Sequence, residues 1–346
     1  MLHQRFFCAL IVALSLVAVA VPGRSAAQKQ AAQKTAAEKP AAQKSKDKKP
    51  SSEGTPVMWR EPGNIAEKDL YWGSGSEDRA PKPPFTFKSE DLKGTQIKID
   101  VTDANGEKWK VKFGREVHAE TAATRLVWAF GYMVDETYFV PSGKIEDATA
   151  LKRARRFIGS DGTFQEARFE RRPKNVKRTD IRWAWGDNPF IGTKELSGLR
   201  ILMTMLNDWD TRRRSKNNLV VEIQGDDGKI EDWYEVGDLG STFGHMASLV
   251  HRTEWNLEEF KRQKFIDRVN GKTLYLHYEG GSKSMNEVPL EHACWFAAMA
   301  AQLTENQIRR AFEAAGATQA EIDGFSSRIM EKIKELQSAV NESLRP

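Results

Sequence analysis

The chain has 346 residues, of which 40% are hydrophobic and two are cysteines, and this composition excludes a disulfide scaffold and a fully disordered chain. Its formal net charge is +5, but residues 1–50 contribute +7 and the remaining residues carry −2. Basic residues that lie outside the folding part give no support to nucleic-acid binding. We therefore expect no nucleic acid among the partners.

The first 27 residues have the three parts of a secretory signal peptide. A short basic segment ends at Arg5, residues 6–21 carry no charge, and Ser25-Ala26-Ala27 offers small residues for cleavage. The uncharged run has 16 residues, fewer than the ~20 that span a bilayer, which disfavours an uncleaved membrane anchor. The pattern predicts a signal peptide over residues 1–27, no later transmembrane segment, and a periplasmic or secreted protein.

Residues 28–90 are predicted to be a disordered linker and arm. The motif Ala-Ala-(Gln/Glu)-Lys recurs at positions 26, 31, 36 and 41, a spacing that fits neither a helix nor a strand. Residues 26–50, which contain this repeat, have no large apolar residue and cannot form a core, and prolines interrupt the arm that follows.

A β-hairpin is the first element predicted in the folded part. Residues 95–102 and 108–114 alternate polar and apolar side chains, as strands with one buried face do. Asn105-Gly106 lies between them, and this dipeptide is typical of a tight hairpin turn.

A helix and a third strand follow the hairpin. Apolar residues at helical spacing predict a helix over residues 118–131, which ends at Gly131. Thr137–Pro141 has the composition of a short strand that ends at its proline. We expect residues 91–140 to form a small lobe with an antiparallel sheet.

The segment 152–182 is strongly basic, with eleven Lys or Arg residues against four acidic residues. Aromatic residues scarcely interleave with these charges, which favours a solvated insert over a binding surface. The alternative is a landing surface for an anionic protein or glycan.

The remaining residues, 141–346, are predicted to form a mainly helical lobe that carries this insert. Leucine and methionine at helical spacing predict a helix over residues 194–206, and strands are expected at 218–224 and 232–237. Two capping boxes mark later helix starts, at Thr304-Glu-Asn-Gln307 and at Thr318-Gln-Ala-Glu321.

Several common catalytic motifs do not occur in the sequence. It contains no Gly-x-Ser-x-Gly elbow, no His-Glu-x-x-His, no Cys-x-x-Cys and no Gly-x4-Gly-Lys-(Ser/Thr) loop. Zinc hydrolysis, serine hydrolysis of the elbow type and P-loop chemistry are therefore disfavoured.

Five polar residues remain as candidates at the ends of predicted elements. Lys112 ends a hairpin strand, and Glu120 lies in the first turn of the next helix, where it can pair with Lys112. Asp210 follows a helix, Asn218 starts one strand and Asp238 ends another. Phosphoryl transfer requires such parts: a Lys held by a Glu, an Asp near the acceptor hydroxyl, and oxygen ligands for Mg²⁺.

The candidates lie in three motifs: Lys112 with Glu120-Thr-Ala-Ala-Thr-Arg-Leu-Val-Trp-Ala-Phe-Gly131; Leu206-Asn-Asp-Trp-Asp210 with Asn217-Asn218; and Asp238-Leu-Gly-Ser-Thr-Phe-Gly244. Together they resemble the atypical protein-kinase-like fold shared by HipA-type bacterial kinases and secretory-pathway kinases. The last motif is the most specific, because the secretory kinases show Asp-x-Gly-x-x-Phe-Gly at their metal-binding Asp. The resemblance covers about residues 95–250.

The resemblance implies an α+β, two-lobed protein-kinase-like fold with a small antiparallel-sheet N-lobe and a mainly helical C-lobe. It implies that Lys112 holds phosphates, that Glu120 orients Lys112, that Asp210 is the catalytic aspartate, and that Asn218 and Asp238 hold Mg²⁺ or Mn²⁺. It places ATP at a hinge over Tyr138–Pro141, with Tyr138 and Val140 as cofactor-binding residues. Gly73-Ser-Gly-Ser76 is the only candidate for a glycine-rich loop.

Two functions follow as hypotheses. The first is a secreted kinase-like phosphotransferase that uses a metal-bound nucleotide to phosphorylate a hydroxyl acceptor. The alternative is a catalytically inactive pseudokinase-type binding module that holds an anionic partner. Two observations support this alternative: Asn217 and Asn218 follow Asp210 by seven and eight residues, where these families usually have five, and a periplasm is not expected to supply ATP. A weaker third hypothesis, a carbohydrate binder, rests on the ten Trp residues.

Overall fold

The computed structural model describes residues 54–211, 218–225, 227–246, 252–278 and 283–343. The chain divides into two units, residues 1–49 and 50–346, and the description below concerns the second. The predicted signal peptide and the Ala/Lys-rich part of the predicted linker lie outside the described residues.

Five strands form a closed barrel in the order β2-β3-β4-β6-β5. Their bounds are β2 Phe85–Asp91, β3 Ile97–Thr102, β4 Lys108–Phe113, β5 Thr137–Glu146 and β6 Thr163–Arg171. The predicted hairpin is confirmed, with Ile97 opposite Phe113 and Thr102 opposite Lys108. Alternate side chains of β3 and β4, among them Ile99 and Val111, fill the barrel interior because successive residues of a strand face opposite sides.

The barrel extends past both ends of the range 91–140 that the sequence suggested for the small lobe. β2 begins at Phe85, and β6 ends at Arg171 inside the predicted basic insert. The insert prediction is therefore wrong for most of 152–182, because these residues form β6 and then β7, Val176–Trp183. Five of the cations, Arg168, Arg171, Arg172, Lys177 and Arg178, form ion pairs with carboxylates.

The predicted disorder is also wrong for residues 54–90. Strand β1, Thr55–Val57, pairs in parallel with β9, Ile230–Glu235, and a 3-10 turn follows at Ile65–Glu67. Met58, Ile65 and Leu70 are almost completely buried. Prolines shape this arm, but its spaced apolar side chains attach it to the main core.

A second sheet has the order β1-β9-β8-β7, with β8 at Asn218–Gln224. The predicted helix over 194–206 is confirmed as α2, Lys194–Leu206, and the predicted strands at 218–224 and 232–237 correspond to β8 and β9. Helix α1, Glu116–Ala129, confirms the helix predicted at 118–131 and contacts both the barrel strands β4, β5 and β6 and helix α6.

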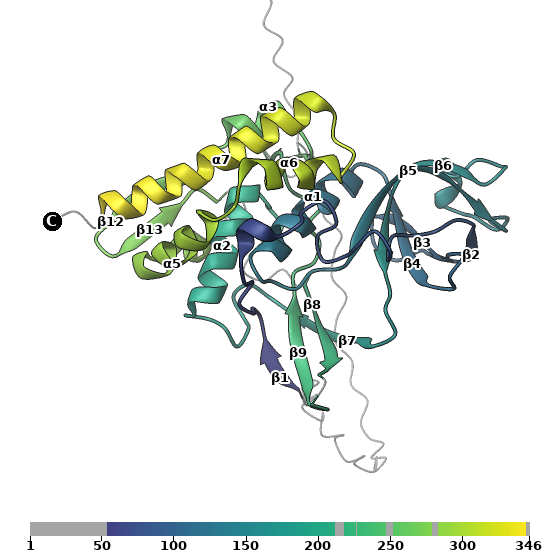
Figure 1. The fold of residues 1–346 in the computed structure, drawn as a ribbon, viewed down its shortest axis with the longest axis horizontal. Coiled ribbons are helices and arrows are strands. Elements are labelled where there is room, and N and C mark those ends of the chain that lie inside the picture. Colours follow the sequence, from purple (N-terminus) through teal and green to yellow (C-terminus); the bar gives the residue numbers. More distant parts are fainter. Residues whose placement is uncertain (1–53, 212–217, 226, 247–251, 279–282, 344–346) are drawn as a thin grey trace, which may run out of the picture. The chain divides into compact units, whose positions relative to one another are not determined.

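The remaining helices are α3 Leu257–Arg262, α4 Lys283–Asn286, α5 Leu290–Ala300, α6 Glu305–Glu313 and α7 Gln319–Glu342. Short strands occur at His245–Met246 (β10), Arg252–Thr253 (β11), Ile266–Asn270 (β12), Thr273–Leu276 (β13) and Glu287–Pro289 (β14). A second 3-10 turn lies at Ala154–Arg156. Both capping boxes, at Thr304 and Thr318, are present. In Figure 1 the barrel strands gather on the right and helices α5, α6 and α7 on the left. The α+β class is confirmed.

In the part of the chain that the structure describes, no helix has the length and apolar character needed to cross a membrane.

Candidate functional site

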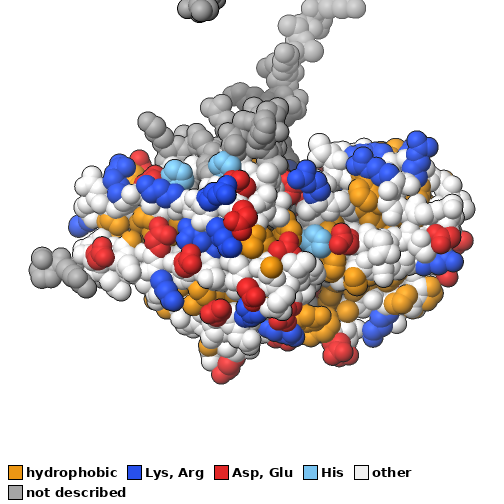
Figure 2. All heavy atoms as spheres, turned by 90° about the horizontal axis from the view of Figure 1, so that it is seen from above, with side chains coloured by type: hydrophobic (Ala, Val, Ile, Leu, Met, Phe, Trp, Pro, Cys, Tyr) orange, Lys and Arg blue, Asp and Glu red, His pale blue; other side chains and the backbone are white. Residues whose placement is uncertain are grey.

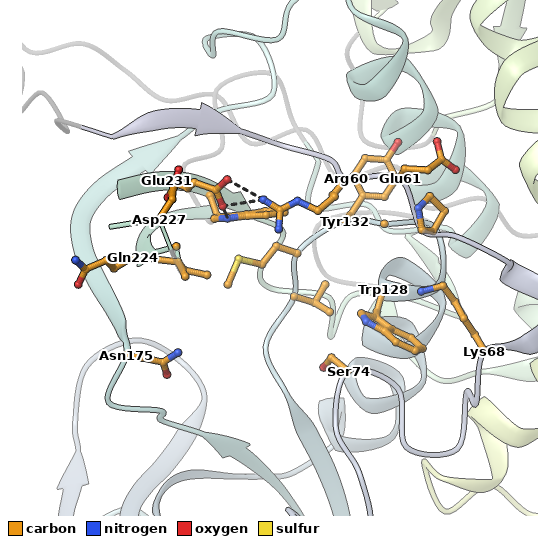
Figure 3. Close-up of a pocket in the computed structure, with 17 residues that line it drawn as sticks. Arg60, Glu61, Lys68, Ser74, Trp128, Tyr132, Asn175, Gln224, Asp227 and Glu231 are labelled. Carbon is orange, nitrogen blue, oxygen red and sulfur yellow. Dashed lines mark hydrogen bonds and ion pairs between the residues drawn. The ribbon is translucent and has the colours of Figure 1, made fainter. Parts of the chain in front are cut away.

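Two cavities are candidates for the functional site. The larger, about 870 Å³, lies against the arm and the turn between β8 and β9. In Figure 3 its Arg60 side chain reaches Glu231, which accepts two hydrogen bonds at 2.7 and 2.9 Å. The second, about 670 Å³, is lined by Lys112, Glu120 and Asp238. We take the second as the candidate site because it joins three residues selected for their chemistry, whereas none of the five candidates lines the larger cavity.

Lys112 and Glu120 form the predicted ion pair. Lys112 Nζ donates to Glu120 Oε2 at 2.7 Å, and both side chains are mostly buried. The pair forms because the end of β4 turns at Gly114, which has a φ of +103°, directly into helix α1. A residue one turn into that helix then lies beside the end of the strand.

Arg168 of β6 contacts Glu120 from the other side, with Nη2 at 3.2 Å from Oε1. Its side chain is 1% exposed, and it also donates to Glu170 at 2.7 Å. Glu170 in turn contacts Arg172 and Arg178. Arg168 was missed in the sequence because it lies in the segment interpreted as a solvated insert.

Other cations of this segment are paired as well. Arg171 contacts Glu107 at 3.0 Å, Arg178 contacts Glu235 at 3.3 Å, and Lys177 contacts Glu222. The strands therefore hold a network of opposite charges. Figure 2 likewise shows Lys and Arg beside Asp and Glu over much of the face that it presents.

Asp238 follows β9 and lines the candidate site. Its φ of +57° lies in the left-handed region, which Asp tolerates better than most residues. Burial raises the pKa of its carboxyl group, Glu120 and Asp210 act in the same direction, and Lys112 opposes them. The carboxylate is thus placed among other acids, where a cation would relieve the repulsion.

Asp210 lies in the loop after α2. That helix ends at Asn207, whose φ is +54°, and the buried carboxylate of Asp208 then accepts the Asp210 N–H at 2.9 Å. Ser241 Oγ donates to Asp210 Oδ2 at 3.4 Å, which connects this loop to the one that begins at Asp238. Asp210 and Asp238 are therefore brought close enough to interact electrostatically.

Asn218 is buried at the start of β8 but does not line the cavity. Its Oδ1 accepts the Gly237 N–H at 3.1 Å, and its Nδ2 is buried without a partner. Asn218 therefore holds the backbone next to Asp238.

The predicted hinge at Tyr138–Pro141 is wrong in its secondary structure. β5 continues through Pro141 to Glu146, and it pairs with β6 on both sides of the proline. Tyr138 is buried in the barrel core, where its hydroxyl donates to Glu136 at 2.6 Å and accepts from the Ser76 N–H. Neither Tyr138 nor Val140 lines the candidate site.

The loop between β2 and β3, residues 92–96, borders the site and was not selected from the sequence. Gln96 donates to Glu116 at the start of α1, and Lys98 lines the cavity with Lys112. The segment selected instead, Gly73–Ser76, contacts Tyr138. The loop contains a single glycine, Gly94, so it has no glycine-rich motif by which the sequence could identify it.

Glu116 is a carboxyl group near the site with an unusual pKa. Burial raises its pKa to about 7, the charges of Glu120, Asp238 and Glu254 add to this shift, and Lys112 opposes it. Its Oε2 is buried without a hydrogen-bond partner, beside the backbone of Gly240.

We expect Glu116→Gln to stabilise the protein at pH 8 by about 2 kcal/mol, with no gain at pH 4. The folded-state pKa is raised, so the stability that protonated Glu116 contributes is present below its unfolded value near 4.5 and is lost as pH rises through about 7. Urea unfolding at both pH values measures the difference. Glu291→Gln, on an 85% exposed side chain, is the control and should change neither value. Equal stability of Glu116→Gln and wild type at pH 8 would contradict the prediction.

Whether a metal ion fits the site depends on the acidic side chains near it. Among the described residues, no group of three or more His, Cys, Asp or Glu side chains is placed to hold a metal ion. Mg²⁺, however, usually binds one or two carboxylates and takes its other ligands from phosphate and water. The Asp238 carboxylate, which lines the cavity, fits that pattern, whereas the oxygen of Asn218 already accepts a backbone N–H.

Comparison with known proteins gives matches among solved structures alone. No family model matches the chain, and no curated protein matches it. Two solved structures are similar over most of their length. One is a crystal structure of the Golgi casein kinase with Mn/ADP bound (12% identity, TM-score 0.39, 81% of this chain and 82% of that chain). The other is "Crystal structure of the golgi casein kinase" (12%, 0.40, 83% and 83%). Scores this low establish neither a shared family nor the role of any residue.

Proposed function

We propose that the chain is a kinase-like phosphotransferase with a two-lobed fold, which uses a metal-bound nucleotide to phosphorylate a hydroxyl acceptor. The observation that carries the proposal is the buried pair of Lys112 and Glu120, 2.7 Å apart, in one cavity with Asp238. A lysine held by a glutamate on a helix, opposite an aspartate, is the arrangement with which kinases bind nucleotide phosphates and their metal.

In this proposal Lys112, Asp210 and Asn218 have separate roles. Lys112 Nζ donates to phosphate oxygens while Glu120, itself held by Arg168, fixes its position. Asp210 accepts the proton of the acceptor hydroxyl, since its carboxylate lies on the loop that meets the Asp238 loop. Asn218 acts indirectly, because it holds the Gly237 N–H next to Asp238.

Mg²⁺ or Mn²⁺, held by Asp238 together with phosphate oxygens and water, would neutralise charge on the transferred phosphoryl group. The nucleotide is proposed to be ATP. The acceptor is proposed to be a protein or glycan, and the periplasmic or secreted location is a proposal that rests on residues 1–27.

The position of Asn218 favours a second candidate, a catalytically inactive pseudokinase-type binding module for an anionic partner. Its amide oxygen is directed to Gly237, and Asn218 does not line the cavity, so the second metal ligand implied by the resemblance is missing from it. Such a module would retain the charged cavity without turnover.

Binding of Mn²⁺–ATP is expected to raise the melting temperature of the wild type by about 5 °C at saturating ligand. Lys112→Met should abolish this shift because it removes the phosphate-binding cation. Lys334→Met, on the exposed surface of α7, is the matched control and should retain the shift. Differential scanning fluorimetry with and without the metal measures it.

Transfer of labelled γ-phosphate to a library of Ser- and Thr-containing peptides then separates the two candidates. Binding with transfer supports the phosphotransferase, and binding without transfer favours the pseudokinase module. A wild type that neither binds nor transfers contradicts the proposal.

A further inference from the structure

The turn at residues 152–154 is attached to strand β2 through the Glu90 carboxylate and to the β2–β3 loop through the Arg153 guanidinium. The Glu90 carboxylate at the end of β2 accepts three backbone N–H groups, from Lys152, Arg153 and Ala154, at 2.5 to 2.7 Å. Burial acts to raise the pKa of Glu90, but these N–H donors hold it below its usual value. The turn is therefore fixed to the strand that leads into the β2–β3 loop.

Arg153 then reaches back over that loop, residues 92–96. Its guanidinium donates to the carbonyl oxygens of Leu92 at 3.3 Å, of Gly94 at 2.9 Å and of Thr95. The planar fork of Arg can hold several acceptors at fixed angles, which a Lys ammonium does less well. We call this arrangement the Arg153 clamp.

The clamp fixes the direction of the loop's N–H groups. In a trans peptide plane the C=O and the N–H point in opposite directions. Because the carbonyls of Gly94 and Thr95 point to Arg153, the N–H groups of Thr95 and Gln96 point away from it. Gln96 also donates its side-chain amide to Glu116, which lies beside the site, so the loop is tied on both sides.

We infer that Arg153 is a positioning residue, which turns the N–H groups of Thr95 and Gln96 toward the phosphate groups of a nucleotide bound in the site. Successive backbone N–H groups that point one way form an anion-binding concavity. This inference rests on the proposed function, since it assigns the loop to phosphates. Arg153 itself touches no substrate.

Arg155, two residues further along the chain, provides a matched control. It lies in the 3-10 turn that Arg153 precedes and is exposed, and no carboxylate or carbonyl contact of its side chain occurs among the described residues. Arg155→Ala removes the same charge from the same turn without removing the clamp. Arg153→Lys keeps the charge but cannot hold three carbonyls.

The experiment has two measurements. NMR order parameters of the backbone of residues 92–96, without nucleotide, should fall in Arg153→Ala and stay unchanged in Arg155→Ala. The dissociation constant of Mn²⁺–ADP should rise about tenfold in Arg153→Ala and nearly as much in Arg153→Lys. Binding of adenosine, which has no phosphate, should be equal in all variants.

The outcomes separate this inference from the proposed function. If the wild type binds no Mn²⁺–ADP, the proposed function fails and the phosphate role of the loop fails with it. If the wild type binds but Arg153→Ala binds equally well despite its lower order parameters, only the inference is overturned. Equal losses for ADP and adenosine also overturn it, because Arg153 would then act on the fold in general.

Discussion

Replacing Arg168 with Met is expected to lower the free energy of unfolding by about 3 kcal/mol at pH 8. Methionine retains most of the apolar stem, so the loss reports on the charge and its hydrogen bonds. Arg168 is 1% exposed and contacts Glu120 and Glu170, whose burial makes unpaired negative charge costly. Urea unfolding followed by circular dichroism measures the effect.

Arg171→Met is the matched control on the same strand. Arg171 is 20% exposed, its closer partner Glu107 is 40% exposed, and its second partner, Glu136, is 3.7 Å away, so water screens these interactions more than those of Arg168. We expect a change of about 0.5 kcal/mol there. The cost of Arg168→Met should shrink at pH 5, because carboxylates that lose their cation take up protons more readily. Equal effects of the two substitutions, or no dependence on pH, would show that the Arg168 contacts do not stabilise the fold.

The elements predicted correctly are those that local patterns determine. Alternation of side chains and Asn105-Gly106 determine the hairpin, and the spacing of leucines determines α2. The pairing of Lys112 with Glu120 was also predictable, because only a short turn separates their strand and helix. These features need no knowledge of distant parts of the chain.

Errors arose where distant residues decide the outcome. Arg168 is buried because Glu120 and Glu170 neutralise it, and a charge count along the sequence cannot reveal such pairing. Pro141 does not end β5, since its neighbours Val140 and Ser142 both pair with β6. Closure of the barrel through β2 and β5 likewise requires strands that are far apart in the sequence.

The candidate site likewise combines residues that local patterns bring together with residues that only long-range contacts bring together. Lys112 and Glu120 come from one local unit, whereas Asp238 and Asp210 are joined through Ser241 on separate loops. Sequence reasoning selected these residues from their chemistry at the ends of predicted elements and from a resemblance, but it placed the nucleotide at Tyr138, in the barrel core. The role of the loop at residues 92–96 could not be predicted from the sequence, because its contacts with Arg153 and Glu116 join residues far apart along the chain.

Asp238→Asn is expected to reduce phosphoryl transfer about a thousandfold and to leave the protein at least as stable as the wild type at pH 8. Asn adopts the left-handed backbone region as readily as Asp, so the φ of +57° is not strained by the change. Burial raises the pKa of Asp238, which means that its ionised form costs stability in the folded protein. An amide removes that cost together with the charge that would hold a metal ion.

Loss of activity without loss of stability distinguishes a functional carboxylate from a structural one, because a carboxylate kept for packing would show both losses or neither. Transfer of labelled phosphate and urea unfolding, measured on one preparation, give the two quantities. Asp227→Asn, an exposed residue of the β8–β9 turn, makes the same charge change and should alter neither. If Asp238→Asn lost stability and activity in proportion, the carboxylate would be part of the scaffold, and the metal would have to be held elsewhere.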